Sequence, residues 1–402
     1  MGRIGIYGGT FNPPHRGHLL ALREFQSGLN LDRILMIPDA VPPHKDMPEG
    51  SPDPETRLRL CRLAVSDLPF VEVSDMEIRR AGKSYTAVTI TELKKRFPND
   101  ELVLLMGTDM FLTFHQWRNP EIIAENASLA MAHRRDASKE ERAEVEAQKE
   151  RLRKDYGTTV TVLQNAIFDV SSTTVRTLLS YRAGASLLPE AVCREILRLG
   201  LYRTGEPFRG LPFEALRKAS LSRHKPARRV HAEGCCKTAV ALARRWGADE
   251  DAAARAGILH DITKRLSFRE QLILCEEYGI VIDDFYRQND KPLHALTGAA
   301  VAARLFGERK AVSEAIRWHT TGKADMTLLE KIIYLADMIE PGRNFPGVAQ
   351  LRKLSAENLD LAVLQALEQT VGFVSAKRAP LHPDSLRALR WQRNVLSIPE
   401  NK

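Results

Sequence analysis

Hydrophobic positions follow different patterns in the two halves of this chain of 402 residues. In the first half, short apolar segments alternate with stretches of helical periodicity. This alternation predicts a parallel sheet with helices on both faces, a doubly wound α/β fold, with strands at 3–7, 33–37, 101–106 and 128–132. Ligands of such a sheet bind at the carboxyl ends of its strands. A charged run at 138–155 is typical of a solvent-exposed helix.

The second half keeps a helical period almost throughout. Apolar positions recur with this period at 238–246, 252–259, 298–306 and 328–339, which predicts an all-α bundle. Between the two patterns, glycine and proline gather at 204–210, as is typical of a linker. We therefore expect one domain at 1–203 and a second at 211–402.

Charge and composition indicate which kinds of molecule the protein binds. The net charge of +8 favours anionic ligands, but the arginines are spread along the chain and accompany no RNA-binding aromatic motif. We therefore expect small nucleotides and no specific nucleic acid; the sequence is also compatible with a homo-oligomer. No apolar run approaches the roughly 20 residues that cross a bilayer, so we expect no membrane partner and a cytoplasmic protein. The five cysteines show no Cys-x-x-Cys spacing, which predicts reduced, packed thiols.

A glycine-rich turn follows the first predicted strand and leads into a helix. Gly8 and Gly9 let the backbone turn tightly and approach a phosphate, which the free amides of the helix attract. His15 and His18 are three residues apart, so both imidazoles can converge on one phosphate and neutralise charge while it is attacked. Either histidine by itself would more often be a helix cap or a core group. The whole string from Gly8 to His18 favours the phosphate site.

This string resembles the signature of the His/Thr-x-Gly-His nucleotidyltransferase superfamily, whose sheet is Rossmann-like. Further matches narrow the resemblance, over about residues 1–203, to the bacterial nicotinate-nucleotide adenylyltransferases. These matches are Thr10 and Phe11 within the string, His44-Lys45, Ser84-Tyr85-Thr86, Gly107-Thr108-Asp109, Trp117-Arg118 and Ser171-Ser172-Thr173-Thr174-Val175-Arg176. The family usually has Ile where this chain has Val170, a change that leaves the apolar role intact.

The resemblance implies adenylyl transfer from ATP to nicotinate mononucleotide, which yields the deamido form of NAD and pyrophosphate, with Mg²⁺ on the triphosphate. It places Lys45 and Arg176 at the ATP phosphates. It places Asp109 at the nucleotide ribose and Trp117 against the nicotinate ring, although Trp117 by itself could be a core residue. The hydroxyls at 171–173 could equally cap a helix. Other acceptors in the superfamily are nicotinamide mononucleotide and phosphopantetheine, and the Ser-Tyr-Thr and Gly-Thr-Asp matches count against phosphopantetheine.

Residue types that bind metal ions recur through the helical half. We expect a His-Asp pair at 260–261 to lie on a helix. It follows small residues at 256–257, which would let a neighbouring helix come close. Buried imidazoles and carboxylates are costly without partners, so several that converge in one bundle indicate a metal centre. Six such ligands suffice for two ions with one bridging carboxylate. The candidates are His231, His260, Asp261, His294, His319 and Asp337.

The strings around these candidates resemble the HD phosphohydrolase superfamily and, over about residues 211–398, the bacterial HD-domain symmetric diadenosine tetraphosphate hydrolases. The strings lie at 229–234, 257–264, 319–322 and 336–343. The resemblance implies a di-iron centre, bridged by Asp261, that cleaves diadenosine tetraphosphate into two ADP. Lys264 lies three residues after Asp261 and is a candidate catalytic residue that could bind the attacked phosphate, or else a solvated lysine. Arg343 could bind the polyphosphate or cap helix carbonyls.

Three functional hypotheses from different classes follow. The chain is a fusion of two enzymes, as above. Alternatively, the same ligands serve another phosphohydrolase, such as a nucleotidase or a cyclic-dinucleotide phosphodiesterase. In the third hypothesis, the HD half is a non-catalytic nucleotide sensor; loss of a ligand would favour this, and none of the six is missing. RNA binding by the whole chain lacks any recognised module.

Overall fold

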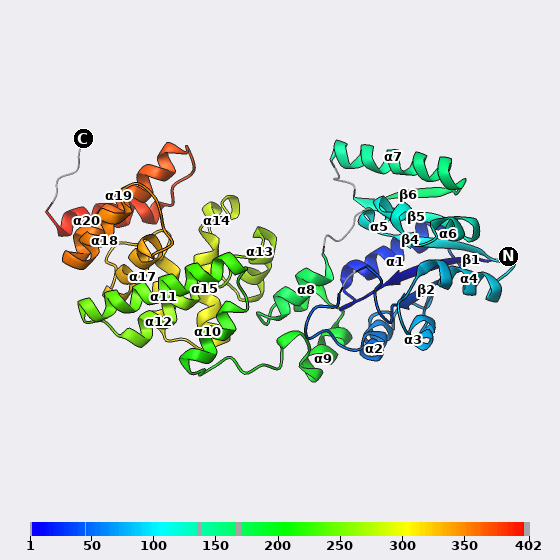
Figure 1. Cartoon of the computed structure of the whole chain (residues 1–402), viewed down its shortest axis with the longest axis horizontal. Helices are drawn as coiled ribbons and strands as arrows, with labels where there is room; N and C mark the ends of the chain where they lie inside the picture. The colour runs from blue at the N-terminus through cyan, green and yellow to red at the C-terminus, as the bar shows by residue number, and fades with distance from the viewer. Residues whose placement is uncertain (1, 45, 135–137, 166–169, 398–402) are drawn as a thin grey trace. The chain divides into compact units, whose positions relative to one another are not determined.

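The structure, a computed structural model, describes residues 2–44, 46–134, 138–165 and 170–397 (Figure 1). It divides into two compact units, Met1–Glu206 and Pro207–Lys402. The boundary between the units falls inside the segment 204–210, where the linker is expected.

A parallel sheet forms the centre of the first unit, with strand order β3-β2-β1-β4-β5-β6. The strands are β1 (Arg3–Gly9), β2 (Arg33–Pro38), β3 (Val71–Val73), β4 (Glu101–Met106), β5 (Ser128–Arg134) and β6 (Val160–Asn165). Strands β2 and β3 lie in turn on one side of β1, and strands β4, β5 and β6 lie in turn on its other side. The doubly wound fold is therefore confirmed, and its strand order reverses between β1 and β4, where such folds bind ligands.

Helices and short 3-10 turns connect these strands. They are α1 (Arg16–Leu29), α2 (Pro54–Ala64), α3 (Met76–Arg80), α4 (Thr86–Arg96), α5 (Thr108–Leu112), η1 (Phe114–Gln116), α6 (Pro120–Asn126), α7 (Lys139–Tyr156), α8 (Ser172–Leu179), η2 (Ala185–Leu187), α9 (Glu190–Leu199) and η3 (Leu201–Arg203). On one face of the sheet, alternate strand positions such as Ile4, Ile6 and Leu104 pack against α4, α6 and α7. This period of two is what a pleated strand requires.

The second unit is helical among its described residues, which confirms the predicted bundle. Its helices are α10 (Phe213–Leu221), α11 (Pro226–Trp246), α12 (Glu250–Leu259), α13 (Phe268–Glu277), α14 (Asp284–Gln288), α15 (Leu293–Val301), the π-helical η4 (Ala302–Phe306), α16 (Lys310–Trp318), α17 (Leu328–Ile339), α18 (Val348–Glu357), α19 (Leu359–Ala376) and α20 (Pro383–Val395).

A glycine brings α11 and α12 into close contact. A Cβ atom at Gly257 would lie only 2.8 Å from the Cα of Cys236, so a larger residue would push the helices apart. Cys235 and Cys236 are buried beside this crossing. All five cysteines are described, and none is in a disulfide. The close crossing holds the middle of α11 against the end of α12. The candidate ligand His231 lies on α11 just before the crossing, and His260 and Asp261 directly follow α12.

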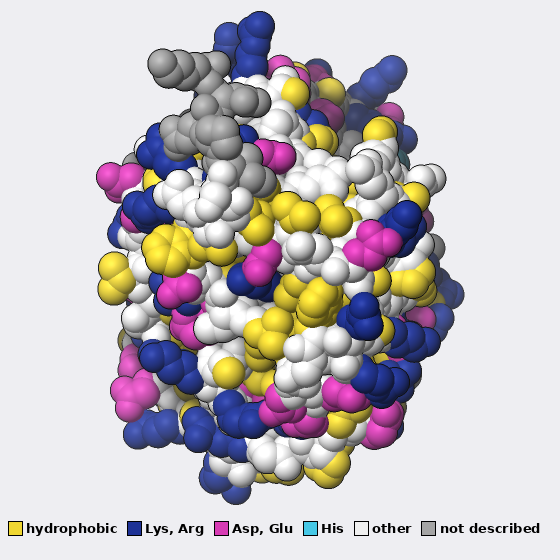
Figure 2. Space-filling view, turned by 90° about the vertical axis from the view of Figure 1, so that its left-hand side faces the viewer, with side chains coloured by type: hydrophobic (Ala, Val, Ile, Leu, Met, Phe, Trp, Pro, Cys, Tyr) yellow, Lys and Arg dark blue, Asp and Glu magenta, His cyan; other side chains and the backbone are white. Residues whose placement is uncertain are grey.

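Surface properties bear on the expected partners. No helix among the described residues combines the length and the hydrophobicity that a membrane crossing needs. Figure 2 shows the face of the second unit that carries the C-terminal helices, where side chains of both charges surround hydrophobic ones. Exposed apolar side chains of α19 and α20 include Phe373, Trp391 and Val395. Assembly into a homo-oligomer stays a prediction.

Candidate functional site

The larger cavity of the first unit, about 650 Å³, opens at the carboxyl ends of β1 and β4. The carboxyl end of β1 with the loop that follows it, the start of α5 and the start of α8 meet here. Gly8 and Gly9 continue strand β1, so the tight turn expected at these two glycines is wrong. Twelve of the expected substrate or catalytic residues line it: Gly8, Gly9, Thr10, Phe11, His15, His18, Gly107, Asp109, Ser171, Ser172, Thr173 and Arg176. Residues as far apart in the sequence as Gly8 and Arg176 thus face one space large enough for a nucleotide.

A smaller cavity, about 110 Å³, adjoins the first and shares Gly8, Gly9 and Met110 with it. The Arg118 guanidinium lies 4.5 Å from the centroid of the Tyr85 ring, as in a cation–π contact. Further expected residues line this cavity: His44, Ser84, Tyr85, Thr86, Trp117 and Arg118. Lys45 lies outside the described residues.

The two histidines of the signature stack on each other. His15 is the N-cap of α1 and His18 lies in its first turn, and their ring centroids are 3.7 Å apart. The backbone N–H of His15 donates to Nδ1 of His18 at 3.1 Å. Because Nδ1 of His18 accepts, a neutral His18 ring carries its proton on Nε2, from which it can donate to a phosphate.

Burial sets the charge of this pair. It lowers the pKa of His15 to about 4 and lowers that of His18 well below its ordinary value, with repulsion from His15 adding to the effect on His18. Both imidazoles are therefore neutral at pH 7 before an anion arrives. A bound phosphate would raise both pKa values and strengthen the donors it meets.

The lowered pKa of His15 predicts a pH dependence of stability. As the pH falls from about 6.5 to about 4, the unfolded chain takes up a proton that folded His15 refuses, so stability falls; above and below this window His15 contributes no slope. The loss is on the order of 3 kcal/mol. Urea unfolding of the wild type and of His15→Gln at pH 7 and pH 4.5 measures it, because glutamine does not titrate. If the free energy of unfolding changes by the same amount in the two proteins between pH 7 and pH 4.5, the lowered pKa of His15 would be contradicted.

Asn12 connects the signature loop to three other segments by hydrogen bonds. Its backbone carbonyl accepts from the Arg176 guanidinium at 2.6 Å, and its side-chain oxygen accepts from the Tyr202 hydroxyl at 2.7 Å. Its amide donates to the Ser51 hydroxyl at 2.8 Å. Ser172, expected at the substrate, donates to the Pro13 carbonyl at 2.9 Å. The residues of α8 therefore fix the loop as well as facing the cavity. The sequence analysis missed Asn12 and Tyr202.

A buried ion pair between Arg57 and Asp39 holds Thr10 in place through hydrogen bonds. Arg57 is 1% exposed and donates to the Thr10 carbonyl at 2.7 Å and to Asp39 Oδ1 at 3.0 Å. The Thr10 hydroxyl donates to Asp39 Oδ2 at 2.7 Å. Asp39 directly follows β2 at the carboxyl edge of the sheet, a position that could have identified it. Nothing in the sequence marks Arg57 as buried.

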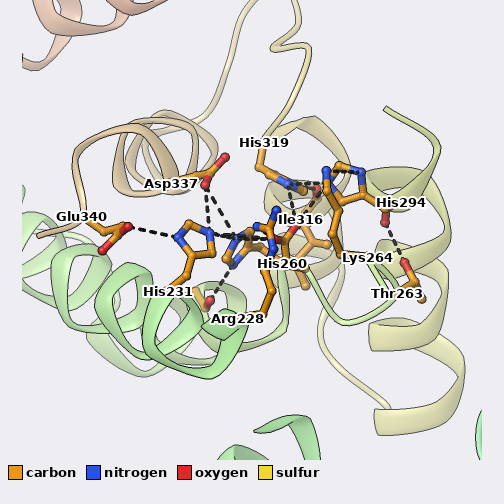
Figure 3. Close-up of polar contacts among 12 residues, drawn as sticks. Arg228, His231, His260, Thr263, Lys264, His294, Ile316, His319, Asp337 and Glu340 are labelled. Carbon is orange, nitrogen blue, oxygen red and sulfur yellow. Dashed lines mark hydrogen bonds and ion pairs between the residues drawn. The ribbon is translucent and has the colours of Figure 1, made fainter. Parts of the chain in front are cut away.

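The six candidate metal ligands converge in the second unit (Figure 3). His231 comes from α11, His294 from α15 and Asp337 from α17, while His319 caps the end of α16. One expectation is wrong: His260 and Asp261 do not lie within a helix. Helix α12 ends at Leu259, so His260 is its C-cap and Asp261 lies in the following turn, with Lys264. The turn aims the carboxylate of Asp261 between the histidines.

Asp261 lies between two pairs of histidines. Its Oδ2 is 3.7 Å from Nε2 of both His231 and His260. Its Oδ1 is 3.1 Å from Nε2 of His294 and 3.8 Å from that of His319. Asp337 Oδ1 joins the first pair, 3.1 Å from His231 Nε2. One carboxylate thus offers an oxygen to each of two adjacent ligand groups, as a bridging ligand must.

A second layer of contacts orients the four imidazoles through their Nδ1 atoms. His260, His294 and His319 place Nδ1 2.8, 2.6 and 2.6 Å from the carbonyls of Gly257, Lys291 and Ile316. His231 Nδ1 lies 3.1 Å from Glu340 Oε1. A ring that donates through Nδ1 keeps the lone pair of Nε2 free, the arrangement that metal-binding histidines use. The sequence analysis missed this role of Glu340, which follows Asp337 by one helical turn.

The charge states suit a divalent cation. Burial lowers the pKa of His260 to about 3 and that of His294 to about 4, so these rings are neutral at pH 7. Burial opposes ionisation of Asp261 and Asp337, but adjacent histidines outweigh it and hold both pKa values well below the ordinary range. Neutral imidazoles around ionised carboxylates form a donor set that iron, zinc and manganese accept.

Three cationic side chains surround these ligands. Lys264 Nζ lies 3.1 Å from His294 Nε2, and burial lowers the pKa of this lysine. Arg343 donates to the carboxylate and, at 2.7 Å, to the backbone carbonyl of Asp337. Arg228, which the sequence analysis did not single out, donates to Asp261 Oδ2 at 2.6 Å. It precedes His231 by three residues on α11, a spacing that puts both on one face.

Comparisons with known proteins agree with this division. A cytidylyltransferase-like family model matches residues 6–178, and an HD domain model matches residues 228–342. The chain is 38% identical over 214 residues to a probable nicotinate-nucleotide adenylyltransferase of Citrifermentans bemidjiense, covering 50% of this chain and 98% of that relative. It is 39% identical over 177 residues to the symmetrical bis(5'-nucleosyl)-tetraphosphatase of Bacillus subtilis, covering 43% of this chain and 92% of that relative. The chain belongs to both families, one in each half.

A solved structure also matches the tetraphosphatase half. It is described as a predicted HD superfamily hydrolase involved in NAD metabolism from Clostridium acetobutylicum. It is 35% identical, has a TM-score of 0.45 and covers 46% of this chain and 98% of that one. The two family models and the curated relatives confirm both family resemblances derived from the sequence motifs. The two ranges that the models match, 6–178 and 228–342, each lie within one structural unit.

Proposed function

We propose that the first half transfers the adenylyl group of ATP to nicotinate mononucleotide, with release of pyrophosphate. The observation that carries this proposal is the pair of adjoining cavities that share Gly8 and Gly9 where the strand order reverses. The larger one has room for ATP and the smaller one for a pyridine ring. The shared glycines have no Cβ to separate the two substrates at the point where their phosphates must meet.

In this proposal, the mononucleotide phosphate attacks the α-phosphorus of ATP, and the bond to the pyrophosphate leaving group breaks. His15 and His18 donate to the α-phosphate as its charge grows, which positions and stabilises it without a covalent intermediate. Arg176 and the amides at the start of α8 hold the departing phosphates. Mg²⁺ bound to the triphosphate would neutralise part of its charge. Asp109 binds the ribose.

The smaller cavity favours nicotinate over nicotinamide as the acceptor. Arg118 is the cation that can pair with the nicotinate carboxylate, and it rests on the Tyr85 ring. The two carboxylates that line the cavity are already compensated: Asp39 by Arg57, and Glu77 by Arg80 at 3.9 Å. A neutral carboxamide would gain less from Arg118 than a carboxylate gains.

For the second half, we propose symmetric hydrolysis of diadenosine tetraphosphate to two ADP. The division of Asp261 between two histidine pairs carries this proposal, since such a geometry fits two ions. His231, His260 and Asp337 would hold one ion and His294 and His319 the other, with iron as the proposed metal. When bound, the pair supplies Lewis acidity and an attacking water of lowered pKa. Lys264 and Arg343 would bind the phosphates, and symmetric cleavage rests on the family membership.

Product analysis tests both halves. The purified chain, loaded anaerobically with Fe²⁺ and assayed for metal content, is offered ATP with either mononucleotide and, separately, a panel of dinucleoside polyphosphates, cyclic dinucleotides and mononucleotides. We expect the deamido form of NAD from the first reaction, ADP alone from the tetraphosphate, and two metal ions per chain. ATP plus AMP would contradict symmetric cleavage, and a preferred cyclic dinucleotide would identify another phosphohydrolase. Metal-dependent binding without turnover would indicate a sensor.

We also propose that residues 1–203 and 211–402 form independent domains. Separately expressed fragments 1–206 and 207–402 should each fold and keep their own activity, because each set of candidate residues lies within one unit. Specific activities of the fragments and of the intact chain give the comparison. Aggregation of either fragment, or loss of its reaction, would show that the halves depend on each other. The cytoplasmic location stays a prediction.

A further inference from the structure

Arg228 lies at the outer edge of the metal-ligand cluster. The four imidazole side chains are between 0 and 11% exposed, and that of Asp261 is 4% exposed. By contrast, the side chain of Arg228 is 41% exposed although it contacts Asp261 Oδ2 at 2.6 Å. A solute that approaches the buried ligands therefore reaches this guanidinium from the solvent side.

The net charge of the cluster, with Arg228 included, suits an anionic substrate. Three carboxylates, Asp261, Asp337 and Glu340, are matched by the cations Arg228, Lys264 and Arg343. Two bound divalent ions would then give the centre an excess of about four positive charges. A dinucleoside tetraphosphate carries one negative charge on each of its four phosphates. The charge of the complete centre, Arg228 included, thus matches that class of substrate.

A divalent ion would also change what Arg228 can bind. The ion between His231 and His260 would share Asp261 Oδ2 with the guanidinium, because that oxygen faces both. Two cations on one oxygen repel each other, and the guanidinium is the mobile one. A phosphate oxygen at the centre offers it a second anionic partner, and a planar guanidinium suits bidentate phosphate binding.

The positions of the cations bear on where this phosphate would lie. Figure 3 shows Arg228 beside His231 and His260, and Lys264 beside His294. A linear polyphosphate cut at its middle extends in both directions from the attacked phosphorus. It therefore needs cations on both sides. Lys264 lies on the His294 side, and the cations on the His231 side are Arg228 and Arg343, which contacts the Asp337 carboxylate.

We infer that Arg228 binds the nucleoside polyphosphate on the His231 and His260 side of the centre, opposite Lys264. This inference deepens the proposed hydrolase function and rests on it for the identity of the substrate. Arg228 contacts Asp261 and the phosphate from the solvent side, and its charge is part of the affinity for the substrate and for the ADP product.

Binding of ADP to the Mn²⁺-loaded full chain, followed by calorimetry, tests the inference without turnover. The Asp261→Asn variant supplies the baseline for ADP that binds to the adenylyltransferase half. Arg228→Ala should weaken the remaining ADP binding about 10-fold or more, the effect of losing a charge-assisted hydrogen bond, with two Mn²⁺ still bound. Arg228→Lys should fall between the two, since it keeps the charge but not the planar fork.

Arg229→Ala is the matched control. It removes one positive charge from the next position of α11, where the side chain is exposed and donates to the His224 carbonyl at 3.4 Å. It should bind ADP and Mn²⁺ as the wild type does. Equal ADP affinity in the Arg228→Ala and Arg229→Ala variants would overturn the inference. Loss of Mn²⁺ from Arg228→Ala with ADP affinity unchanged would also overturn it and limit Arg228 to positioning Asp261. Failure of the chain to hydrolyse diadenosine tetraphosphate would contradict the proposed function without changing these readouts.

Discussion

Asp261→Ala is expected to stop hydrolysis by the second half while adenylyl transfer by the first half continues. Loss of one group that stabilises a transition state typically costs about 10²–10³-fold. Asp261 faces both histidine pairs, so we expect the loss to reach at least ~10³-fold, together with both metal ions. Metal analysis and release of ADP from diadenosine tetraphosphate measure the two effects in one preparation.

The matched control for this variant is Asp360→Ala. Asp360 pairs with Lys331 at 2.7 Å in the same bundle, and its side chain is 41% exposed. Its removal should leave metal content and hydrolysis near the wild-type values. Full hydrolysis by Asp261→Ala would rule out the dinuclear site, and equal losses in the two variants would point to a general loss of folding.

His18→Ala should lower adenylyl transfer by roughly 10²–10³-fold and leave hydrolysis unchanged. The imidazole is held by the backbone N–H of His15 so that its other nitrogen can donate to the attacked phosphate. Pyrophosphate release from ATP and nicotinate mononucleotide is the measurement, with substrates varied to separate kcat from KM. A donor that acts mainly in the transition state should lower kcat more than it raises KM.

His115→Ala serves as the control for His18. His115 lies in η1, within 3.2 Å of the Gln148 side chain, and is not among the residues that line either cavity. It should retain the wild-type rate. Pyrophosphate release at a near-normal rate by His18→Ala would refute the role of this histidine.

The sequence predicted candidate site residues best where they lie close together in one short motif or recur in a regular pattern. The string from Gly8 to His18 predicted that the segment between a strand and a helix faces a binding site, and this segment lines the larger cavity. Phosphate binding there stays a prediction. The six candidate metal ligands could be predicted as a set because polar residues in apolar helical patterns are costly unless they meet. Their division into two groups around Asp261 depends on how five helices pack, which no local pattern contains.

Other features depend on tertiary contacts alone. Arg57 occupies a helical position like any surface arginine, and only the approach of Thr10 and Asp39 makes it a buried support. The helix expected to include His260 and Asp261 ends at Leu259, although His260 keeps right-handed helical angles, φ −52° and ψ −39°. No glycine or proline follows at 260–267 to mark this end in the sequence. Strand β3, with three residues, is too short for alternation to be recognised.

Tyr202 has a consequence for how this chain can be rearranged in evolution or by engineering. Its hydroxyl reaches back to Asn12 from a position just before the unit boundary, so the first catalytic half is complete only when the chain continues through this residue. A fragment that ended before Tyr202 would keep every signature motif but would lose the hydrogen bond from the Tyr202 hydroxyl to Asn12 in the signature loop. A fusion or truncation that exchanges or removes the second unit should therefore cut the chain only within the few residues that follow Tyr202.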